Sequence, residues 1–567
     1  MAYILEHPDI HIVPTRPEAP RHAGRALAVA GMTALAFALV GGQLVRLALR
    51  GMGTHTTAVS EPIASTYARP EIVDRQGRLL ASDVETLSLY GDPAIIPDPD
   101  EAVERLRTVL SDLDETTLRR SLSDRSRRFA WVRRGLSPAQ AQRIHDLGIP
   151  GLAFRRELRR AYPAGTLAGH LIGSVDIDNK GLGGIEKYVD DKIGVDQVPS
   201  ASPSERAPVR LSIDIGVQHA LEDELRSSIR RYRAAAAAGV VLDARTGEVL
   251  ASASLPDIDP ARPLAAPEED RLDRISGGTF ELGSVFKAFT IAMALDNGQA
   301  GLQSVYDVTK PLAAGPRLIK DEHAPGRPLN VAEIFIHSSN VGSGMLAEAA
   351  GTERQRAFLD RLGLTRRLDS ERGMVAAPQL PERWGQAETV TISYGHGIAI
   401  APLQVASAAA ALVNGGMLMP PTFLRRVPGQ PTAGERVISE ATSAKMRQLF
   451  RSNVTDSAGT GRRAEAEGYE VGGKTGTAEL PGRGGYRHSA VIASFLGAFP
   501  MGAPRYVTLV SLFEPQPVAE SQNRVLAGLN AAPTTSRLVA RIGPLLGVPP
   551  VASQGTAQNS GETFDAP

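Results

Sequence analysis

Residues 280–297 read FELGSVFKAFTIAMALDN and place the pattern Ser284-x-x-Lys287 just ahead of an apolar run that predicts a helix over 288–296. Positions three apart share one face of a helix, so the Ser284 hydroxyl and the Lys287 amine can touch. A neutral lysine beside a serine can accept its proton, which makes a nucleophile without a histidine. The chain contains only 8 lysines, so few positions could supply such a base.

A second motif, Ser338-Ser339-Asn340, follows the apolar run Val331–Ile336. A second hydroxyl can relay a proton, and a neighbouring amide can bind a peptide group of a substrate. The pattern is common by chance, and Ser521-Gln522-Asn523 also matches it. Only Ser338-Ser339-Asn340 lies between the Ser-x-x-Lys motif and the third motif, which is described next.

The third motif is Lys474-Thr475-Gly476-Thr477, which suits an edge strand. Gly476 lets a substrate backbone approach closely, and the threonine hydroxyls can hold a carboxylate. A positive charge on Lys474 would help to keep Lys287 neutral. Ser-x-x-Lys, Ser-x-Asn and Lys-Thr-Gly in this order are typical of penicillin-recognising serine acyltransferases.

The amino-acid composition argues against several classes of function. The 567 residues carry 62 basic and 62 acidic side chains, which argues against a polybasic nucleic-acid-binding protein. The absence of cysteine excludes thiol catalysis, disulfides, thiolate zinc sites and iron–sulfur clusters. We expect neither a metal nor an organic cofactor. The length predicts several domains.

The N-terminal region predicts a membrane anchor. Residues 1–25 are polar and Pro-rich, and we expect a cytoplasmic tail there. Residues 26–45 are uncharged and mostly apolar, and a helix of this length matches the bilayer core. Because a cleaved signal peptide has a shorter apolar region, we expect an uncleaved single-pass span. The rest of the chain is then periplasmic, anchored in the inner membrane.

The remaining chain divides at a Ser- and Pro-rich linker over 197–208. Before it, residues 61–196 predict a mixed domain in which strands flank a turn at Gly77 and a helix starts at Ser137-Pro138. After it, residues 209–546 predict a second domain. The tail at 547–567 is rich in Gly, Ser and Gln, and we expect it to be disordered.

The second domain predicts strands at both ends of its sequence with helices between them. Residues 240–243 and 248–251 flank a turn and predict a hairpin with one exposed face, followed by a helix over 402–413 and strands over 470–473, 490–499 and 505–513. This order predicts an α+β fold, with one antiparallel sheet packed against helices.

The chain as a whole resembles the class B penicillin-binding proteins, which are monofunctional peptidoglycan transpeptidases. Besides the three motifs, several segments carry the resemblance: Arg69 with Ile72–Gly77, Arg160–Gly165, Gly184–Tyr188, Ser393–Gly397 and Ala401–Gln404. The last two segments, and the Glu-Leu-Gly before Ser284, look most like the division-type members. The resemblance implies an elongated pedestal domain followed by a penicillin-binding transpeptidase domain.

The resemblance also implies a substrate and roles for the motif residues. The substrate is a peptidoglycan stem peptide ending in D-Ala-D-Ala, and β-lactams would bind covalently. Ser284 would attack the penultimate D-Ala carbonyl with Lys287 as base, and Ser338, tuned by Lys474, would pass a proton to the leaving amine. The substrate-binding groups would be Asn340, Thr475, Gly476 and Thr477, with backbone N–H groups of Ser284 and Thr477 forming the oxyanion hole. A polytopic membrane glycosyltransferase and other division proteins are the implied partners.

Three positions depart from the family pattern. Pro70 stands where glycine is usual, His396 where tyrosine is usual, and Ser339 where the related β-lactamases carry aspartate. No glutamate can be assigned the deacylating role of those enzymes, so a fast hydrolase is disfavoured. Two alternatives to a division enzyme remain: an elongation-type transpeptidase, and a non-catalytic β-lactam receptor or divisome scaffold.

Overall fold

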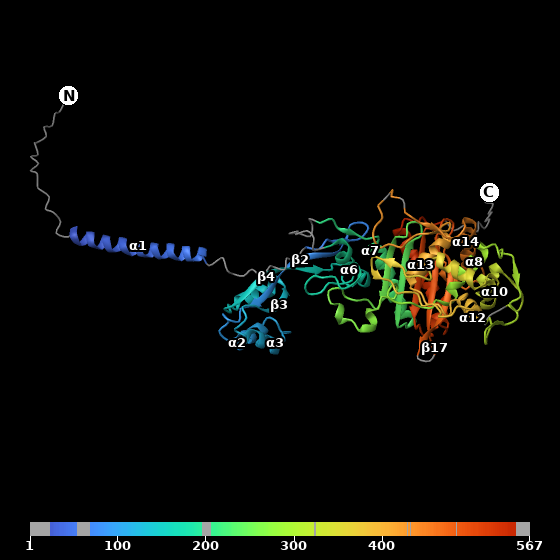
Figure 1. Ribbon diagram of the computed structural model, residues 1–567, viewed down its shortest axis with the longest axis horizontal. Coiled ribbons are helices and arrows are strands. Elements are labelled where there is room, and N and C mark those ends of the chain that lie inside the picture. Colours follow the sequence, from blue (N-terminus) through green and yellow to red (C-terminus); the bar gives the residue numbers. More distant parts are fainter. Residues whose placement is uncertain are drawn as a thin grey trace, which may run out of the picture. The chain divides into compact units, whose positions relative to one another are not determined.

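The computed structural model describes residues 23–53, 68–194, 206–321, 325–427, 429–430, 432–482 and 485–551. The chain forms two compact units, Met1–Ser65 and Thr66–Pro567 (Figure 1). The predicted linker lies mostly outside the described residues. So do nearly all of the predicted cytoplasmic tail and the C-terminal tail beyond residue 551.

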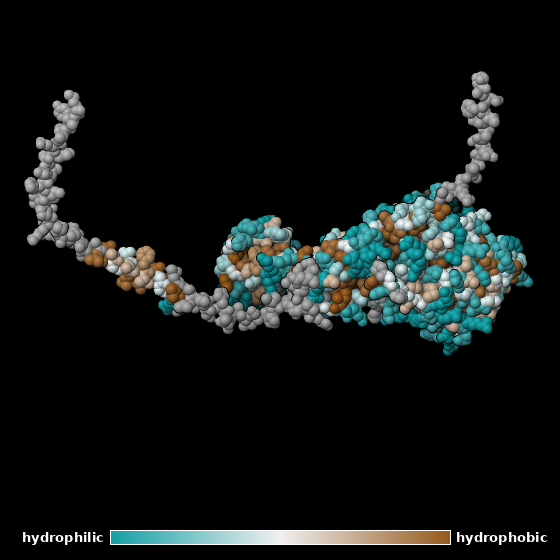
Figure 2. All heavy atoms as spheres, turned by 90° about the horizontal axis from the view of Figure 1, so that it is seen from above, coloured by the Kyte–Doolittle hydropathy of each residue, from teal (hydrophilic) through white to brown (hydrophobic). Residues whose placement is uncertain are grey.

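The first unit contains one long helix, α1 (Ala23–Gly53). Its large apolar side chains, among them Leu27, Leu35 and Phe37, are exposed, as the brown spheres along this helix in Figure 2 show. Among the helices of the described residues, none combines the length and the mean hydropathy that a membrane crossing needs. The structure therefore confirms the helix predicted over 26–45 but does not confirm the span.

The second unit begins with a mixed domain, the predicted pedestal. A five-stranded sheet runs in the order β3-β2-β1-β5, and β4 also pairs with β2. Its strands are β1 (Ile72–Val73), β2 (Leu79–Gly91), β3 (Ala130–Leu136), β4 (Leu152–Ala161) and β5 (Val209–Arg210). Its helices are α2 (Pro99–Arg107), α3 (Glu115–Ser123), α4 (Pro138–Asp146), α5 (Gly169–Ile172) and α6 (Gly184–Tyr188), which a π-helix continues over Val189–Ile193.

Local signals in the pedestal sequence are confirmed. Gly77 has φ +89° in the turn between β1 and β2, a conformation that glycine adopts without strain. Ser137 caps α4 with a reciprocal capping box, and Pro138 occupies the first turn.

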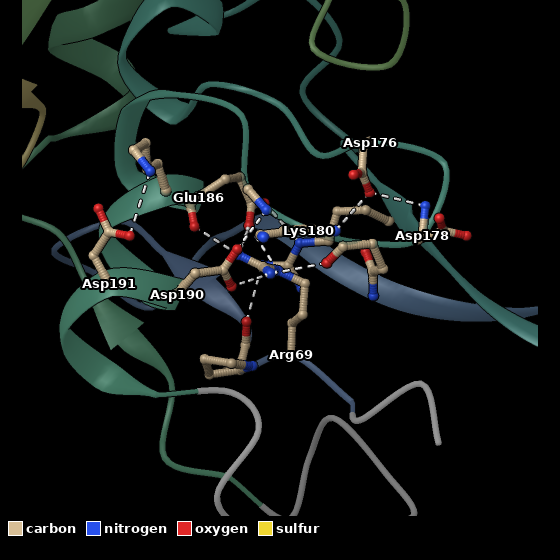
Figure 3. A network of polar contacts seen from close by, with 12 residues as sticks. Arg69, Asp176, Asp178, Lys180, Glu186, Asp190 and Asp191 are labelled. Carbon is tan, nitrogen blue, oxygen red and sulfur yellow. Dashed lines mark hydrogen bonds and ion pairs between the residues drawn. The ribbon is translucent and has the colours of Figure 1, made fainter. Parts of the chain in front are cut away.

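A buried network of ion pairs and hydrogen bonds lies at the start of the pedestal domain (Figure 3). The fully buried carboxylate of Glu186 accepts from Arg69 Nε at 3.0 Å and from Arg160 Nε at 2.7 Å. Arg160 also donates to Asp83 Oδ1 at 3.1 Å and to the carbonyl of Pro70 at 2.9 Å. Because position 70 contributes only its carbonyl to the network, proline replaces the usual glycine there without losing a hydrogen bond.

The centre of the second domain is an antiparallel sheet in the order β16-β17-β18-β6-β7. The strands are β6 (Ala236–Asp243), β7 (Val249–Leu255), β16 (Gly472–Gly482), β17 (Gly485–Phe499) and β18 (Tyr506–Phe513). The predicted sheet is confirmed, and β16, which carries the Lys-Thr-Gly motif, lies at its edge. The register pairs Lys474 with Leu496 and Thr477 with Ala493.

Helices cover both faces of this sheet. Along β6, Val240 and Leu242 pack into the core that contains α8, α13 and α14, whereas Ala237 and Val241 pack against α7 and α15. The alternation follows the two-residue period of a strand. The prediction that the hairpin has an exposed face is wrong, because every residue of β6 and β7 is buried between two helical layers.

The helices of this domain are α7 (Ile215–Tyr232), α8 (Lys287–Asp296), α9 (Val331–Ile336), α10 (Asn340–Ala350), α11 (Thr352–Arg361), α12 (Gln386–Ile392), α13 (Pro402–Val413), α14 (Glu440–Thr455) and α15 (Ala531–Leu545). Short strands form four two-stranded sheets, in which β8 (Val305–Tyr306) pairs with β11 (Leu329–Asn330), β9 (Leu312–Ala314) with β10 (Arg317–Ile319), β12 (Asp369–Ser370) with β13 (Gly373–Met374), and β14 (Met417–Leu418) with β15 (Glu435–Arg436).

Candidate active site

The Ser284 side chain is positioned by a short 3-10 turn, Gly283–Phe286, that leads directly into α8. Lys287 is the first residue of α8 and is completely buried, whereas Ser284 is half-buried and lines a large cleft. In the described residues the Lys287 amine is hydrogen-bonded to Ser338 rather than to Ser284. Its Nζ donates to the Ser338 carbonyl and, at 3.1 Å, to Ser338 Oγ.

Lys474 approaches the same hydroxyl from the sheet. Its Nζ donates to Ser338 Oγ at 2.9 Å and lies 5.7 Å from the centre of the Phe335 ring. Both lysines are fully buried beneath the cleft, so the first and third motifs meet at the second. Ser338 itself has φ +59°, a strained backbone conformation for a serine, which is typical of functional sites.

Burial shifts the pKa of both amines downward. Removal from water lowers the pKa of Lys287 to about 7, against an opposing effect of Asp321. The pKa of Lys474 also falls well below its usual value, first through burial and then through the positive charge of Lys287. From the sequence we expected the charge of Lys474 to keep Lys287 neutral. In the structure, burial is the main cause of the lowered pKa of Lys287, and the charge of Lys287 contributes to lowering the pKa of Lys474.

The carboxylate of Asp321 holds the second motif in place by hydrogen bonds. We did not predict this residue from the sequence. Its carboxylate accepts from the N–H groups of Asn340 at 2.6 Å and Val341 at 3.1 Å, and from the Ser339 hydroxyl. Ser339 in turn caps α10 by accepting from the Gly342 N–H at 2.8 Å. Asp321 thus supplies a carboxylate next to position 339, where the β-lactamase motif carries its own. It lies in an irregular loop, and nothing in its sequence context indicates this contact.

The threonines of the third motif are held differently. Thr477 Oγ1 accepts from the Ala527 N–H at 3.1 Å, and its own hydroxyl proton has no acceptor among the described residues. Thr475 Oγ1 donates to Thr460 Oγ1 at 2.7 Å, and Thr460 Oγ1 donates to Asn453 Oδ1 at 3.1 Å. The Thr475 hydroxyl proton is therefore engaged within the protein, and the Thr477 proton is available to a ligand.

Glycines allow the turn that carries Ser284 to lie against β16. A Cβ at Gly476 would lie 2.2 Å from the Leu282 carbonyl oxygen, and one at Gly283 would lie 2.7 Å from the Thr477 carbonyl oxygen. A Cβ at Gly395 would in turn lie 2.2 Å from the Gly283 carbonyl oxygen. Gly476 was expected to admit a substrate backbone, but in the structure the segment that approaches it is the chain's own nucleophile turn.

These groups surround a cleft of about 1040 Å³. Ser284, Ser338, Asn340, Thr475 and Thr477 all line it. The structure therefore brings the residues predicted from three distant motifs to one place. The second Ser-x-Asn match also reaches the cleft, through Gln522, but from the loop after β18 rather than beside Ser338.

His396 lies at the edge of the cleft beside Glu281. Its Nδ1 is 3.1 Å from Glu281 Oε2, and its ring packs edge-on against that of Tyr394 with centroids 5.6 Å apart. Glu281 Oε1 also accepts from the Gly397 N–H at 2.9 Å, so the carboxylate joins His396 to the segment that follows it. These contacts agree with a structural role for this histidine. In the described residues no group of three or more metal-binding side chains gathers, at this site or elsewhere.

A half-buried serine, two buried lysines of lowered pKa and a hydroxyl between them can transfer an acyl group through the serine. The fold and this site together define a penicillin-recognising serine transpeptidase domain. Residues 237–532 match the penicillin-binding protein transpeptidase domain, and residues 65–196 match the penicillin-binding protein dimerisation domain. The chain belongs to the family of penicillin-binding proteins with these two domains.

Comparisons with individual proteins support this family assignment. The chain is 40% identical over 500 residues to the probable peptidoglycan D,D-transpeptidase FtsI of Caulobacter vibrioides, covering 87% of this chain and 84% of that protein. It is 30% identical over 476 residues to the peptidoglycan D,D-transpeptidase FtsI of Escherichia coli K12, covering 79% of each. The transpeptidase domain of penicillin-binding protein 3 from Burkholderia pseudomallei superimposes with a TM-score of 0.54 at 31% identity, over 60% of this chain and 97% of that one.

Proposed function

We propose that this protein is a division-type peptidoglycan D,D-transpeptidase that crosslinks stem peptides at the septum through an acyl-enzyme on Ser284. The observation that carries the proposal is the Ser338 hydroxyl, which accepts from Lys287 at 3.1 Å and from Lys474 at 2.9 Å beside the nucleophile turn. The relatives named as peptidoglycan D,D-transpeptidases support the same activity.

In the first half-reaction, Ser284 attacks the carbonyl of the penultimate D-Ala, and its proton passes to the neutral Lys287 amine. Backbone N–H groups of Ser284 and Thr477 receive the developing oxyanion, at roughly 3 kcal/mol for each donor. The Ser338 hydroxyl passes a proton to the departing D-Ala amine and is replenished from the adjoining lysines. The C–N bond then breaks and leaves an ester on Ser284.

Substrate groups would be held by the walls of the cleft. The free hydroxyl proton of Thr477 faces the terminal carboxylate, and Thr475 supports it from the same strand. Gly476 keeps the strand close to Ser284, and the Asn340 amide orients the donor peptide. In the second half-reaction, an amine of a neighbouring stem peptide attacks the ester, gives up its proton through the same groups and forms the crosslink. A β-lactam would follow only the first half-reaction, because its leaving group stays tethered.

The cellular setting is part of the proposal. We infer a short cytoplasmic tail over 1–25, an anchor over 26–45 in the inner membrane, a periplasmic pedestal over 61–196, a transpeptidase domain over 209–546 and a C-terminal tail over 547–567. The uncharged run within α1 supports the anchor. A polytopic glycosyltransferase and other division proteins are the proposed partners. The presence of residues near Met1 in membrane-extracted protein, against a start beyond residue 50, separates an uncleaved anchor from a cleaved leader.

Labelling with benzylpenicillin tests the acylation of Ser284 directly. We expect one covalent adduct, on Ser284, in wild-type protein and none in the Ser284→Ala variant. An adduct on another serine, or none in folded wild-type protein, would remove the proposal. The scaffold alternative is disfavoured because two buried amines are costly, and a scaffold would be more stable with apolar residues in their place. The position of a fluorescent fusion, at the septum or along the side wall, separates the division type from the elongation type.

A further inference from the structure

One wall of the cleft carries three arginines that the acyl transfer described above does not use. Arg462 and Arg463 lie in a 3-10 turn (Arg462–Ala464) between α14 and β16, and Arg524 lies in the loop between β18 and α15. All three line the cleft and are exposed to it. We call these three residues the arginine wall.

The two loops that carry the arginine wall are both hydrogen-bonded to β16, the strand of the third motif. Thr460 accepts from Thr475 at 2.7 Å in the first loop, and the Ala527 N–H donates to Thr477 at 3.1 Å in the second. The loops also meet each other, since a Cβ at Gly528 would lie 2.5 Å from the Thr460 carbonyl oxygen. The arginines are therefore held on one continuous surface beside the threonines of β16.

The backbone before Arg524 is strained. Gln522 and Asn523 have φ +55° and +54°, a region that residues other than glycine enter at a cost. Two consecutive residues of this kind reverse the chain tightly, and the next residue, Arg524, lines the cleft. Strain of this sort persists where the surrounding structure requires it and is frequent at ligand sites.

The guanidinium groups of the arginine wall are not neutralised by acidic side chains. Among the ion pairs of the described residues, none involves these arginines, and Arg462 donates instead to the Ser457 carbonyl at 3.0 Å. Two carboxylates also line the cleft, but Asp321 is committed to the N-terminus of α10 and Glu479 has an interaction of its own. Guanidinium binds carboxylate in a planar, bidentate manner, so this wall suits an anionic peptide.

We propose that Arg462, Arg463 and Arg524 bind a carboxylate of the peptide substrate and so select anionic stem peptides. The proposal rests on the proposed transpeptidase function. The carboxylate could come from the peptide's C-terminus, next to Thr477, or from a second acidic group further along the peptide. Both sources share the same chemistry, and the experiment separates them.

The test uses the full-length chain in detergent with all three arginines changed together to glutamine. The substrates are acetyl-Glu-Lys-D-Ala-D-Ala and acetyl-Gln-Lys-D-Ala-D-Ala, and the readouts are kcat/KM for each peptide and the acylation rate with benzylpenicillin. Arg354→Gln, an exposed arginine on α11, is the matched control. A triple lysine variant keeps the charge but loses the planar, bidentate geometry of guanidinium, so it should retain only part of the rate.

If the wall binds the second carboxylate, the triple glutamine variant loses about tenfold in kcat/KM on the Glu peptide and little on the Gln peptide. If it binds the C-terminal carboxylate, the loss is equal on both peptides and extends to benzylpenicillin. Rates within about twofold of wild type on all three compounds would overturn the proposal. Failure of the wild-type protein itself to react would instead remove the proposed function.

Should the triple variant fail to fold, salt dependence of the wild-type protein gives an independent answer. Exposed charges are screened more strongly as salt rises, so kcat/KM for the Glu peptide should fall severalfold between about 20 and 200 mM salt. It should fall less for the Gln peptide if the second carboxylate is the ligand, and equally if the C-terminal carboxylate is. Rates for both peptides that do not change with salt would contradict the proposal.

Discussion

Lys474 Nζ donates a hydrogen bond to Ser338 Oγ at 2.9 Å. Lys287 Nζ donates to the same oxygen at 3.1 Å, so the hydroxyl accepts from two buried amines. An oxygen that accepts twice has its own proton left to donate elsewhere, and Ser338 lines the cleft. The three groups therefore form a proton-transfer unit directed at the substrate.

Ser338→Ala should disable this unit. Loss of the hydroxyl removes a shared acceptor from both lysines and the proton donor to the leaving amine, so acylation by benzylpenicillin should fall about 100-fold. Ser343→Ala, which removes a buried hydroxyl inside α10, should change the rate little. The measurement is the second-order acylation rate after circular dichroism has confirmed folding, and a rate near wild type for Ser338→Ala would rule out the relay.

The acylation rate should depend on pH through Lys287. The pKa of this lysine is lowered to about 7, and only the neutral amine can accept the Ser284 proton. The second-order rate should therefore rise about tenfold per pH unit below 7 and level off above it. Because Asp321 raises the pKa of Lys287, Asp321→Asn should move the inflection to lower pH. An inflection near the ordinary lysine value would contradict the lowered pKa of Lys287.

Thr477 and Thr475 should contribute unequally to carboxylate binding. The Thr477 hydroxyl proton is free, whereas that of Thr475 is donated to Thr460. Thr477→Val should therefore weaken peptide turnover and benzylpenicillin acylation by about tenfold or more, since a hydrogen bond to a charged group contributes roughly 1.5–3 kcal/mol. Thr477→Ser should restore most of the rate. Thr475→Val should cost less activity, and its effect should appear as a loss of stability of about 1 kcal/mol. Equal losses of activity would show that both hydroxyls reach the ligand.

The pedestal network predicts a large stability effect from one carboxylate. Glu186 is fully buried between Arg69 and Arg160, so Glu186→Gln removes the carboxylate that the two guanidinium groups share and leaves each of them with one other carboxylate partner. We expect a loss of about 3–5 kcal/mol in the free energy of unfolding, measured by denaturant titration. Asp191→Asn breaks the exposed pair with Lys187 nearby, also drawn in Figure 3, and should cost less than about 1 kcal/mol. A small effect at Glu186 would mean that the network contributes little to folding.

Much of the architecture was predictable because it is encoded locally. Apolar runs and strand–turn patterns indicated α8, α13 and the strands of the central sheet, and the Ser137-Pro138 start of α4 was recognisable from its capping chemistry. The motif order indicated the nucleophile and both lysines, and β16 lies at the sheet edge as expected. The helices, the strands and the cap of α4 depend on neighbours within a few residues, so the linear sequence contains them.

Contacts between distant segments were not predictable in the same way. The sequence identified Ser284, Lys287, Ser338 and Lys474 as a set, but only the tertiary structure decided that both amines meet at the Ser338 hydroxyl. The contact between Asp321 and Asn340 was not predictable either, and neither was the grouping of the arginine wall. In both cases the residues that meet lie far apart along the chain. The lowered pKa of Lys287 depends on complete burial, which arises only when α8 packs against α9, α10 and α14. Residue types thus determined which chemistry was available, and packing determined which groups touch and which are removed from water.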